Sequence, residues 1–209
     1  MLDPKCKICR RAGVKLFLKG EKCSSPKCTI IKRPFPPGIF GKKRRRALSE
    51  FGKELAEKQK LKNWYNLDER QFGKYVREIL AKGGKIQDPS ASLVERLEMR
   101  LDNAVFRLGF AASHSQARQL VSHGHFLVNQ KRVSSPSYQL KKGDKIIINP
   151  VSKKMKILEG LAAALKKHSV PSWLNLDVGK LEGEVIGVPT VEETAPLAEI
   201  TAIFEYYSR

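Results

Sequence analysis

The sequence predicts an α+β protein. A cysteine-containing N-terminal arm and a mainly helical domain hold an inserted module of two helices packed on a small antiparallel sheet. Three observations support this fold class: all four cysteines lie in the first 28 residues, apolar residues recur at helical spacing between residues 49 and 122, and short alternating runs follow between residues 126 and 148. With 209 residues, of which 41% are hydrophobic, the chain is long enough for one or two small domains.

The charge is strongly positive and unevenly distributed. The chain has 40 Lys and Arg residues against 21 Asp and Glu, a net charge of +19. Residues 1–46 contain 15 basic and 2 acidic side chains and residues 101–156 contain 10 and 2, whereas residues 47–100 contain 11 and 9 and residues 157–209 contain 4 and 8. A solvated surface usually mixes both signs, so two strongly basic segments indicate a polyanionic partner.

No apolar run approaches the length of a membrane span, and the start "MLDPKCKICRR" lacks the apolar segment of a secretory signal. We therefore expect a cytoplasmic protein with no membrane partner.

The cysteines are spaced as C-x2-C-x13-C-x4-C, at Cys6, Cys9, Cys23 and Cys28. Two close pairs of thiolates can converge on one tetrahedral Zn(II), and structural disulfides are disfavoured in a reducing cytosol. One zinc ion per chain is the favoured prediction, and an iron-sulfur cluster is the alternative, because four thiolates can ligate either. With all four positions filled by thiolates, the metal site is expected to be structural.

A basic arm, "KRPFPPGIFGKKRRR", follows the cysteines. Its Pro and Gly content does not suit a core element, so the arm is expected to extend along a phosphate backbone, with Phe35 and Phe40 available to stack or to anchor it. Its consecutive cations are Lys42, Lys43, Arg44, Arg45 and Arg46.

Three helices are expected next. The first is capped by Ser49 and runs to about Leu61, and a second begins at an Asp68–Gln71 capping box and ends at Gly83–Gly84. A third is expected to run from about Ser90 to Leu108, because apolar residues recur through this stretch at helical spacing.

The stretch "SQARQLVSHGHFLVNQKRV" then predicts a helix, a glycine stop and a hairpin. Ser113 and Gln116 fit a capping box, and Gly124 suits a left-handed helix end. A strand at Phe126–Val128, a two-residue turn at Asn129–Gln130 and a returning strand form the hairpin, and "KKGD" makes a further turn before a strand at Ile146–Ile148.

This module is predicted to present one face to folded RNA. Basic side chains would bind phosphates, and shorter polar side chains would bond 2′-hydroxyls or base edges. The basic residues are Arg100, Arg107, Arg118, His123, His125, Lys131 and Arg132. The shorter polar residues are Ser115, Gln116 and Asn129.

The segment "RLDNAVFRLGFAASHSQARQLVSHGHFLVNQKRV" resembles the S-four RNA-binding module. The motifs "CKIC", "KRPFPPG", "KQKLKNWYNLDERQF", "PSWLNLD" and "FEYYSR" resemble, in that order, the bacterial small-subunit ribosomal protein S-four family, in its cysteine-containing, zinc-binding form. The resemblance implies a primary ribosomal-RNA binder that nucleates assembly of the subunit body and contributes to translational accuracy. It also implies contact with neighbouring proteins, including the fifth and twelfth of the small subunit, and with mRNA near the entry channel.

The expected domain boundaries are 1–46 for the metal-binding segment and arm, 47–98 for the first part of the helical domain, 99–150 for the S-four module, and 151–209 for a helix and strands that complete the helical domain.

The chain departs from the family at two places. Family members have a histidine and a more polar pair where this chain has Ile39-Phe40-Gly41, and they have basic residues where this chain has Glu182 and Glu184. The contact of that histidine is therefore not expected here, and RNA contact near residues 182–184 is less favoured.

The end of the chain is acidic, and the alternation of Ile200, Ala202, Phe204 and Tyr206 predicts a terminal strand docked on the protein body. The resemblance implies that this end meets the fifth small-subunit protein. The residues assigned to that interface are Glu199, Glu205, Tyr206 and Arg209.

Two other classes of function were weighed. A pseudouridine synthase-like RNA-modifying enzyme uses an Asp within "RLD", which occurs here at residues 100–102, but inside the first helix of the module and with too little chain after it for a catalytic domain. A zinc-containing nucleic-acid-binding regulator would need a helix with clustered base-reading side chains. We therefore expect no enzyme, no catalytic residue and no small-molecule substrate.

Overall fold

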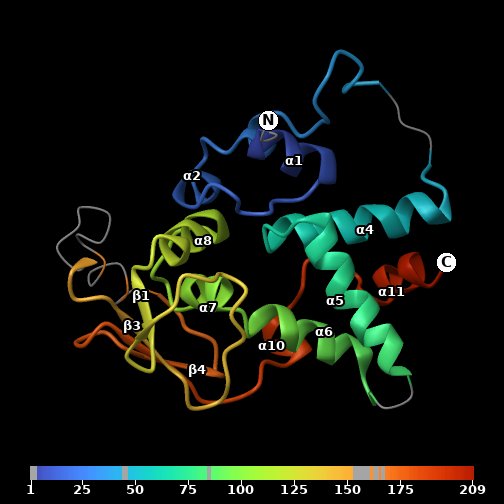
Figure 1. Ribbon diagram of the computed structural model, residues 1–209. Coiled ribbons are helices and arrows are strands. Elements are labelled where there is room, and N and C mark those ends of the chain that lie inside the picture. The colour runs from blue at the N-terminus through green and yellow to red at the C-terminus, as the bar shows by residue number, and fades with distance from the viewer. Residues whose placement is uncertain (1–3, 44–46, 84–85, 153–160, 162–164, 166–167) are drawn as a thin grey trace. The chain divides into compact units, whose positions relative to one another are not determined.

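The chain folds into two compact units, Met1–Ser90 together with Pro196–Arg209, and Ala91–Ala195 (Figure 1). The computed structural model describes residues 4–43, 47–83, 86–152, 161, 165 and 168–209. The first unit is helical and the second combines helices with a small antiparallel sheet, which confirms the predicted α+β class. The predicted arm cations Arg44, Arg45 and Arg46 lie outside the described residues.

The first unit begins with short helices around the cysteines and continues with longer ones. Ser49 caps the fourth helix by accepting a hydrogen bond from the Gly52 amide at 3.2 Å, as its position in the sequence predicts. The helices of this unit are α1 (Lys5–Ala12), α2 (Glu21–Ser24), α3 (Thr29–Lys32), α4 (Glu50–Trp64), α5 (Glu69–Lys82) and α11 (Ile200–Ser208).

The apolar stripe of α5 is buried as expected, at Phe72, Tyr75, Val76 and Ile79. Asp68 stands at the N-cap of this helix, but its side chain makes no capping hydrogen bond, so the predicted capping box does not form.

The C-terminal segment is helix α11, and the strand predicted there is wrong. Ile200 and Ile203 are buried and Phe204 and Tyr207 are partly buried, which is the i, i+3, i+4, i+7 spacing of a helix face. This face packs on α4 and α5, where the ring centroids of Phe72 and Tyr207 lie 6.3 Å apart. Because burial recurs at helical spacing and not at every second residue, the segment forms a helix and not a strand.

The second unit begins with two helices where the sequence predicted one. The chain leaves helical geometry at Met99–Arg100, because the carbonyl of Met99 accepts from the Leu140 amide and the Leu101 amide donates to the Tyr138 carbonyl. This strand-like pairing takes up backbone groups that a continuous helix would use. The helices of this unit are α6 (Pro89–Glu98), α7 (Leu101–Arg107), α8 (His114–Ser122) and α10 (Val191–Thr194).

The sheet has five strands in the order β2-β1-β3-β5-β4, and every neighbouring pair is antiparallel. Asn129 and Gln130 have φ values of 49° and 67°, so the predicted two-residue turn joins β1 to β2. The last two strands, which the sequence assigned to the helical domain, join this sheet, where β5 pairs with β3 and β4 pairs with β5. The strands are β1 (Phe126–Val128), β2 (Lys131–Arg132), β3 (Lys145–Ile148), β4 (Leu174–Asp177) and β5 (Glu182–Val185).

The core of the second unit lies between α7, α8 and the sheet (Figure 1). Phe110 and Phe126 contact each other at 5.8 Å between ring centroids, and Ile146 and Ile148 are fully buried beside them. Gly183 on β5 leaves room for Leu108, because a Cβ there would lie 2.3 Å from a Leu108 methyl carbon. The module helices are thereby fixed against the sheet. Among the described residues, no helix is long and apolar enough to cross a membrane.

Candidate nucleic-acid interface

The four cysteines are brought together in the first unit. Cys9, Cys23 and Cys28 are buried and Cys6 is partly exposed, and all four line one small cavity with Leu18 and Ile30. As these side chains lie, no group of three or more His, Cys, Asp or Glu among the described residues has a geometry that would hold a metal ion. The structure therefore shows the convergence of the thiols and does not itself show metal binding.

The chemistry of this cavity still fits a metal bound by thiolates. Burial raises the pKa of Cys9, the Leu16 backbone N–H opposes that rise by hydrogen bonding, and the charges of the other three cysteines raise it further. The Lys19 amide donates to the Cys23 sulfur at 3.4 Å. Backbone donors around mutually repelling thiolates suit a site in which a cation supplies the missing positive charge.

The arm after the cysteines is anchored by Arg10 on α1. Its Nε donates to the Phe35 carbonyl at 2.8 Å and its Nη2 to the Pro36 carbonyl at 3.2 Å, while its guanidinium lies 5.0 Å from the centre of the Phe35 ring. Lys42 lies over the same ring at 5.5 Å. Phe35 therefore anchors the arm, and Phe40 is left in solvent.

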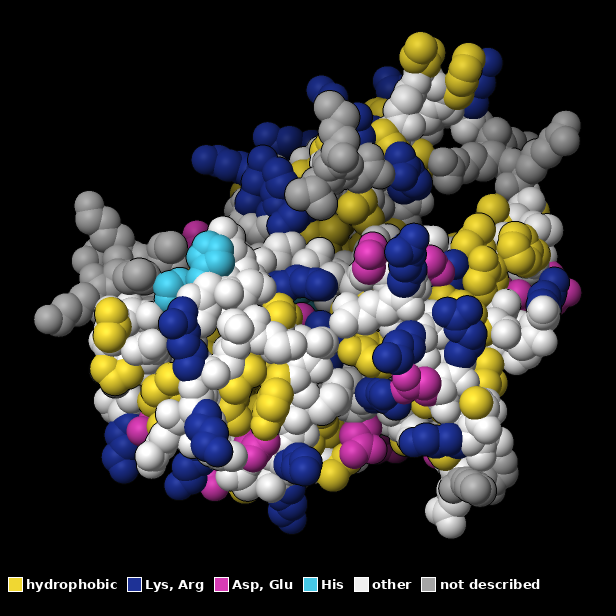
Figure 2. Space-filling view, viewed as in Figure 1, with side chains coloured by type: hydrophobic (Ala, Val, Ile, Leu, Met, Phe, Trp, Pro, Cys, Tyr) yellow, Lys and Arg dark blue, Asp and Glu magenta, His cyan; other side chains and the backbone are white. Residues whose placement is uncertain are grey.

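A groove of about 890 Å³ lies in the first unit between the N-terminal segment and α4. Its walls mix apolar groups with cations from both sides, including Arg10, Arg11, Lys53 and Lys60. Figure 2 shows Lys and Arg side chains gathered over the N-terminal segment. A positively charged groove of this kind suits a phosphate backbone.

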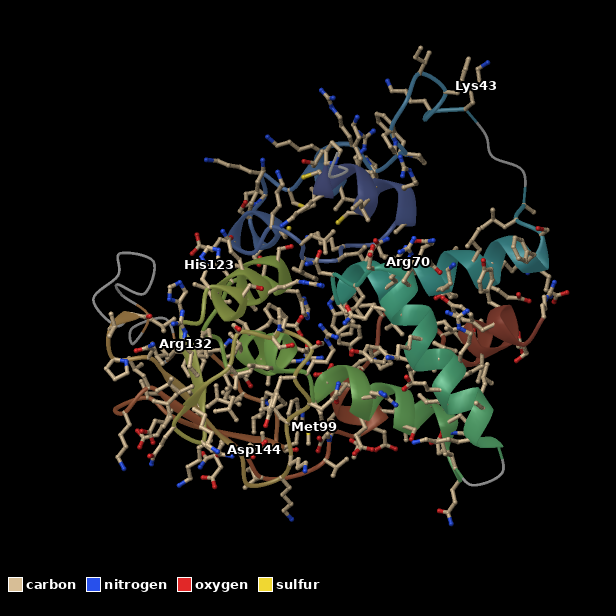
Figure 3. The ribbon with its side chains drawn as sticks, in the orientation of Figure 1. Lys43, Arg70, Met99, His123, Arg132 and Asp144 are labelled. Atoms are coloured by element: carbon tan, nitrogen blue, oxygen red, sulfur yellow. The ribbon has the colours of Figure 1, made fainter. Side chains whose placement is uncertain are left out.

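In the second unit, α8, β1 and β2 form a basic corner, which we define by Arg118, His123, Lys131 and Arg132. His123, Lys131 and Arg132 are exposed and Arg118 is partly exposed. Arg132 donates to the His123 carbonyl at 3.1 Å and lies across Gly124, where a Cβ would be 2.2 Å from its Nε (Figure 3). Gly124 has φ 74°, so a glycine both ends α8 and admits the arginine.

Two helix-start residues predicted to bind RNA lie in the first turn of α8. The Gln116 amide donates to the Ser113 hydroxyl at 3.3 Å, and the Gln116 side chain accepts from the Ala112 amide at 3.0 Å. Gln116 therefore helps to cap the helix. Ser115 lies beside it and is partly exposed.

The structure removes two predicted residues from the RNA face. Arg100 is 1% exposed, and its guanidinium pairs with Asp102 at 2.7 Å because the break between α6 and α7 turns it inward. His125 is buried, and its Nδ1 is 2.9 Å from the Ser152 hydroxyl. Burial, followed by the nearby His123 and Arg132, lowers the pKa of His125, which further weakens it as a cation.

Two other predicted residues have internal partners. Arg107 binds Glu98 through two hydrogen bonds of 2.7 and 3.0 Å, with only one edge toward solvent. Asn129 is exposed, but its side chain donates to Asp144 at 2.8 Å and accepts from the Lys145 amide at 3.0 Å, so it locks the hairpin turn.

A buried polar network that was not predicted from the sequence supports the module. Glu98 bonds Arg107 and Asn103, and the Asn103 side-chain oxygen is 3.0 Å from His114 Nε2. Burial, together with the charges of Arg107 and Arg100, lowers the pKa of His114 to about 3, so this histidine is neutral at physiological pH. The Glu-x4-Asn-x3-Arg spacing around the helix break was the only available signal.

The C-terminal residues assigned to a partner interface divide into two groups. Tyr206 packs on Phe51 at 5.4 Å and under Lys58, and Arg209 pairs with the buried Glu54 at 2.7 Å, so both act within the first unit. Glu199 and Glu205 are exposed.

Glu182 and Glu184 lie on β5 and line a hollow together with Asp177, Lys145 and Lys180. Three carboxylates against two ammonium groups leave this hollow net negative, which disfavours a phosphate there. This agrees with the low expectation of RNA contact at these residues.

Comparison with known proteins places both units in one family. Residues 1–97 match the model described as "Ribosomal protein S4/S9 N-terminal domain", and residues 99–146 match the "S4 domain". A protein of Thermus thermophilus named "Small ribosomal subunit protein uS4" is 44% identical over 208 residues, which is 100% of this chain and 98% of the relative. Proteins of the same name from Dictyoglomus turgidum and Thermotoga petrophila are 46% and 42% identical, over 99% of this chain and 97% of each relative.

The family also decides between the classes of function weighed above. Asp102, the residue that an RNA-modifying enzyme would need, is buried and paired with Arg100. The chain is a structural ribosomal RNA-binding protein and not an enzyme. Identity of this extent over the whole length shows that the chain belongs to the uS4 family of small ribosomal subunit proteins.

Proposed function

We propose that this chain is a primary binder of small-subunit ribosomal RNA that nucleates assembly of the subunit body. The observation that supports this most strongly is the basic corner, where a helix end and a hairpin present cations together on a rigid sheet. The anchored arm and the basic groove give the first unit a second cationic surface of its own.

Each element of the basic corner has a distinct task in this proposal. Arg118, Lys131 and Arg132 bind phosphates, and Ser115 with His123 reaches 2′-hydroxyls or base edges at the first and last turns of α8. Binding neutralises phosphates and releases counterions, so affinity falls as salt rises.

The test is binding of the full chain to protein-free small-subunit ribosomal RNA across a salt series. Replacing Arg118, Lys131 and Arg132 together by alanine should weaken binding and lower the slope of log affinity against log salt by about 0.7 to 0.9 per lost phosphate contact. The matched control replaces Lys141, Lys142 and Lys180, which removes the same charge from turns outside the basic corner. An equal loss of RNA affinity in both variants would mean that binding depends on net charge alone and not on the basic corner.

A comparison with duplex DNA at the same salt concentration separates RNA recognition from general polyanion binding. The proposal expects a clear preference for the folded RNA. Equal affinity for both nucleic acids would instead favour a nonspecific electrostatic interaction.

We also propose that the cysteine cluster binds one structural Zn(II), with an iron-sulfur cluster as the alternative. The support is the convergence of four thiols on one cavity with backbone N–H donors at two of the sulfurs. A bound metal would fix the loops on either side of α1 and α2 and hold Arg10 in position to anchor the arm.

We further propose that the exposed carboxylates Glu199 and Glu205 meet a basic neighbouring protein, the fifth of the small subunit, and that this contact contributes to decoding accuracy. Contacts with the twelfth protein and with mRNA near the entry channel belong to the same proposal, which rests on resemblance. Reversing both charges to lysine should raise miscoding in subunits that contain the variant, while binding to free ribosomal RNA is not weakened. Tyr206 and Arg209 should not be used for this test, because both contact side chains of α4 and their loss would disturb that helix.

A further inference from the structure

The tip of the arm presents an aromatic ring that is mostly exposed. Phe40 is 69% exposed and Ile39 is 94% exposed, although both are large apolar residues. Figure 2 shows hydrophobic side chains beside Lys and Arg side chains at the top of the view, where Figure 3 labels Lys43. Apolar groups held in solvent beside cations indicate an interaction site.

The loop that carries this tip is built to hold it outward. The Gly41 amide donates to the Gly38 carbonyl at 3.2 Å, and the Lys43 amide donates to the Phe40 carbonyl at 3.0 Å. Gly38 has φ 110°, and a Cβ at Gly41 would lie 2.0 Å from the Pro36 carbonyl oxygen, so both positions require glycine. The tip is therefore a defined turn whose two central residues are Ile39 and Phe40.

The base of the loop is fixed independently of the tip. Arg10 binds two carbonyls of the arm and the Phe35 ring, as described above. The two phenylalanines therefore differ in role. Phe35 contacts Arg10 and Lys42 and anchors the arm, whereas the Phe40 ring is exposed to solvent and can contact a partner.

The charge around the tip selects its partner. No Asp or Glu occurs from Lys22 to Ser49, and Lys43 Nζ lies 4.6 Å from the centre of the Phe40 ring. An aromatic face flanked by cations in an acid-free segment matches an unpaired base with its phosphate, because the base stacks on the ring and the phosphate meets the ammonium group.

We propose that Phe40 is a stacking platform for an unpaired base of the ribosomal RNA, and that Lys43 binds a phosphate next to that base. This rests on the proposed RNA-binding function and adds to it a contact that the arm of this chain makes through the Ile39-Phe40 pair.

The test uses the full chain and protein-free small-subunit ribosomal RNA. Phe40→Ala should weaken binding by about 5- to 100-fold without changing the slope of log affinity against log salt, because it removes stacking and no charge. Lys43→Ala should lower that slope by about 0.7 to 0.9. The matched control is Phe17→Ala, which removes a 42% exposed phenylalanine of the same unit outside the arm and should leave affinity unchanged.

Two further variants separate stacking from general apolar contact. Phe40→Trp should retain affinity, and its fluorescence should be quenched when RNA binds, against a constant signal from the buried Trp64 and Trp173. Phe40→Leu should bind as weakly as Phe40→Ala. Wild-type affinity in Phe40→Leu, or an unquenched tryptophan, overturns the proposal, because an apolar side chain without a stacking face would then serve equally well or no base would lie on the ring.

The two proposals fail in different ways. If Phe40→Ala binds normally while the alanine variant of the basic corner is weakened, stacking at the arm is wrong and the proposed function stands. If the wild-type chain shows no preference for ribosomal RNA over duplex DNA, the proposed function fails first.

Discussion

At the scale of single residues, Glu98 shows why a cation on the module is not always a ligand for RNA. Its side chain is fully buried, and Arg107 supplies two hydrogen bonds to its carboxylate. A buried carboxylate that loses its cation keeps the desolvation cost of burial without the compensating attraction. Arg107 therefore contributes mainly to the fold.

Arg107→Ala should lower the free energy of unfolding by about 2 to 3 kcal/mol, because it leaves Glu98 buried with fewer partners. Adding Glu98→Gln should recover part of that loss, since it removes the charge that needs a cation. Denaturant unfolding measures both, with Lys131→Ala, an exposed cation of the same unit, as the control that should stay within about 0.5 kcal/mol of wild type. If Arg107→Ala unfolds like that control and loses RNA affinity instead, Arg107 belongs to the interface.

At the scale of secondary-structure elements, α11 is held on α4 and α5 by a charged cluster. Glu69 accepts hydrogen bonds from Lys58 at 2.7 Å, Lys62 at 2.9 Å and Tyr207 at 2.9 Å. Burial opposes ionisation of Glu69, but these three donors outweigh it and lower the pKa of Glu69 to about 2. The C-terminal helix is therefore fixed by a carboxylate that must be ionised.

This cluster should make the docking of α11 sensitive to acid. The carboxylate ionises at about 4.5 in the unfolded chain and about 2 in the folded one, so its contribution is complete above pH 4.5 and is lost as pH falls toward 2. Because the Glu69 side chain is 47% exposed, the contribution should be about 1 kcal/mol or less. The protection factors of the α11 amides, which are corrected for the intrinsic pH dependence of exchange, should fall in wild type as pH drops through this range and stay constant in Glu69→Gln; equal pH dependence in both chains would assign the change to another group.

The N-terminal segment around the four cysteines is expected to depend on metal binding for its order. Cys9→Ser should lower the metal content of the purified protein to well below one per chain and increase the proteolytic sensitivity of the N-terminal segment, because a tetrahedral thiolate site loses a ligand. Elemental analysis for zinc and iron measures the metal content, and limited proteolysis measures the sensitivity of the N-terminal segment. The proposed metal site would be contradicted if purified wild-type protein contained neither metal, or if all four thiols reacted freely without a chelator.

Local signals predicted much of the fold. Ser49, the Asn129–Gln130 turn and Gly124 lie where their backbone preferences placed them, because caps and tight turns depend on a few adjacent residues. The break at Met99–Arg100 and the helical C-terminus depend on residues far along the chain, at Tyr138–Leu140 and on α4, so periodicity alone could not locate them.

The interface was predicted less completely than the fold for the same reason. His123, Lys131 and Arg132 of the basic corner are exposed, because a hairpin turn and a helix end are surface positions, and Arg118 within α8 is partly exposed. Burial of Arg100 follows from the helix break, which pairs backbone at Leu101 with distant Tyr138 and turns the arginine onto Asp102, and His125 contacts Ser152, 27 residues further along the chain. The sequence shows how many cations the module has, but it does not show which of them are paired with other side chains inside the fold.

At the scale of the whole molecule, two compact units each present a cationic surface, and residues 157–209, with 4 basic and 8 acidic side chains, are net negative. The first unit provides the anchored arm and the groove beside α4, and the second provides the basic corner. In the proposed function, phosphate contacts spread over both units would make binding strong in sum, although each contact is screened by salt.

The central claim is that this chain is held in the small ribosomal subunit by its own contacts with ribosomal RNA. Sedimentation of cell extracts through a high-salt wash tests it most directly, with the wild-type chain and the variant lacking Arg118, Lys131, Arg132 and Phe40 side chains compared. The account predicts that the wild-type chain stays in amounts equimolar with the small-subunit RNA and that the variant is released at lower salt. Release of the wild-type chain at the same salt as the variant, or its absence from the small-subunit fraction, would contradict the account.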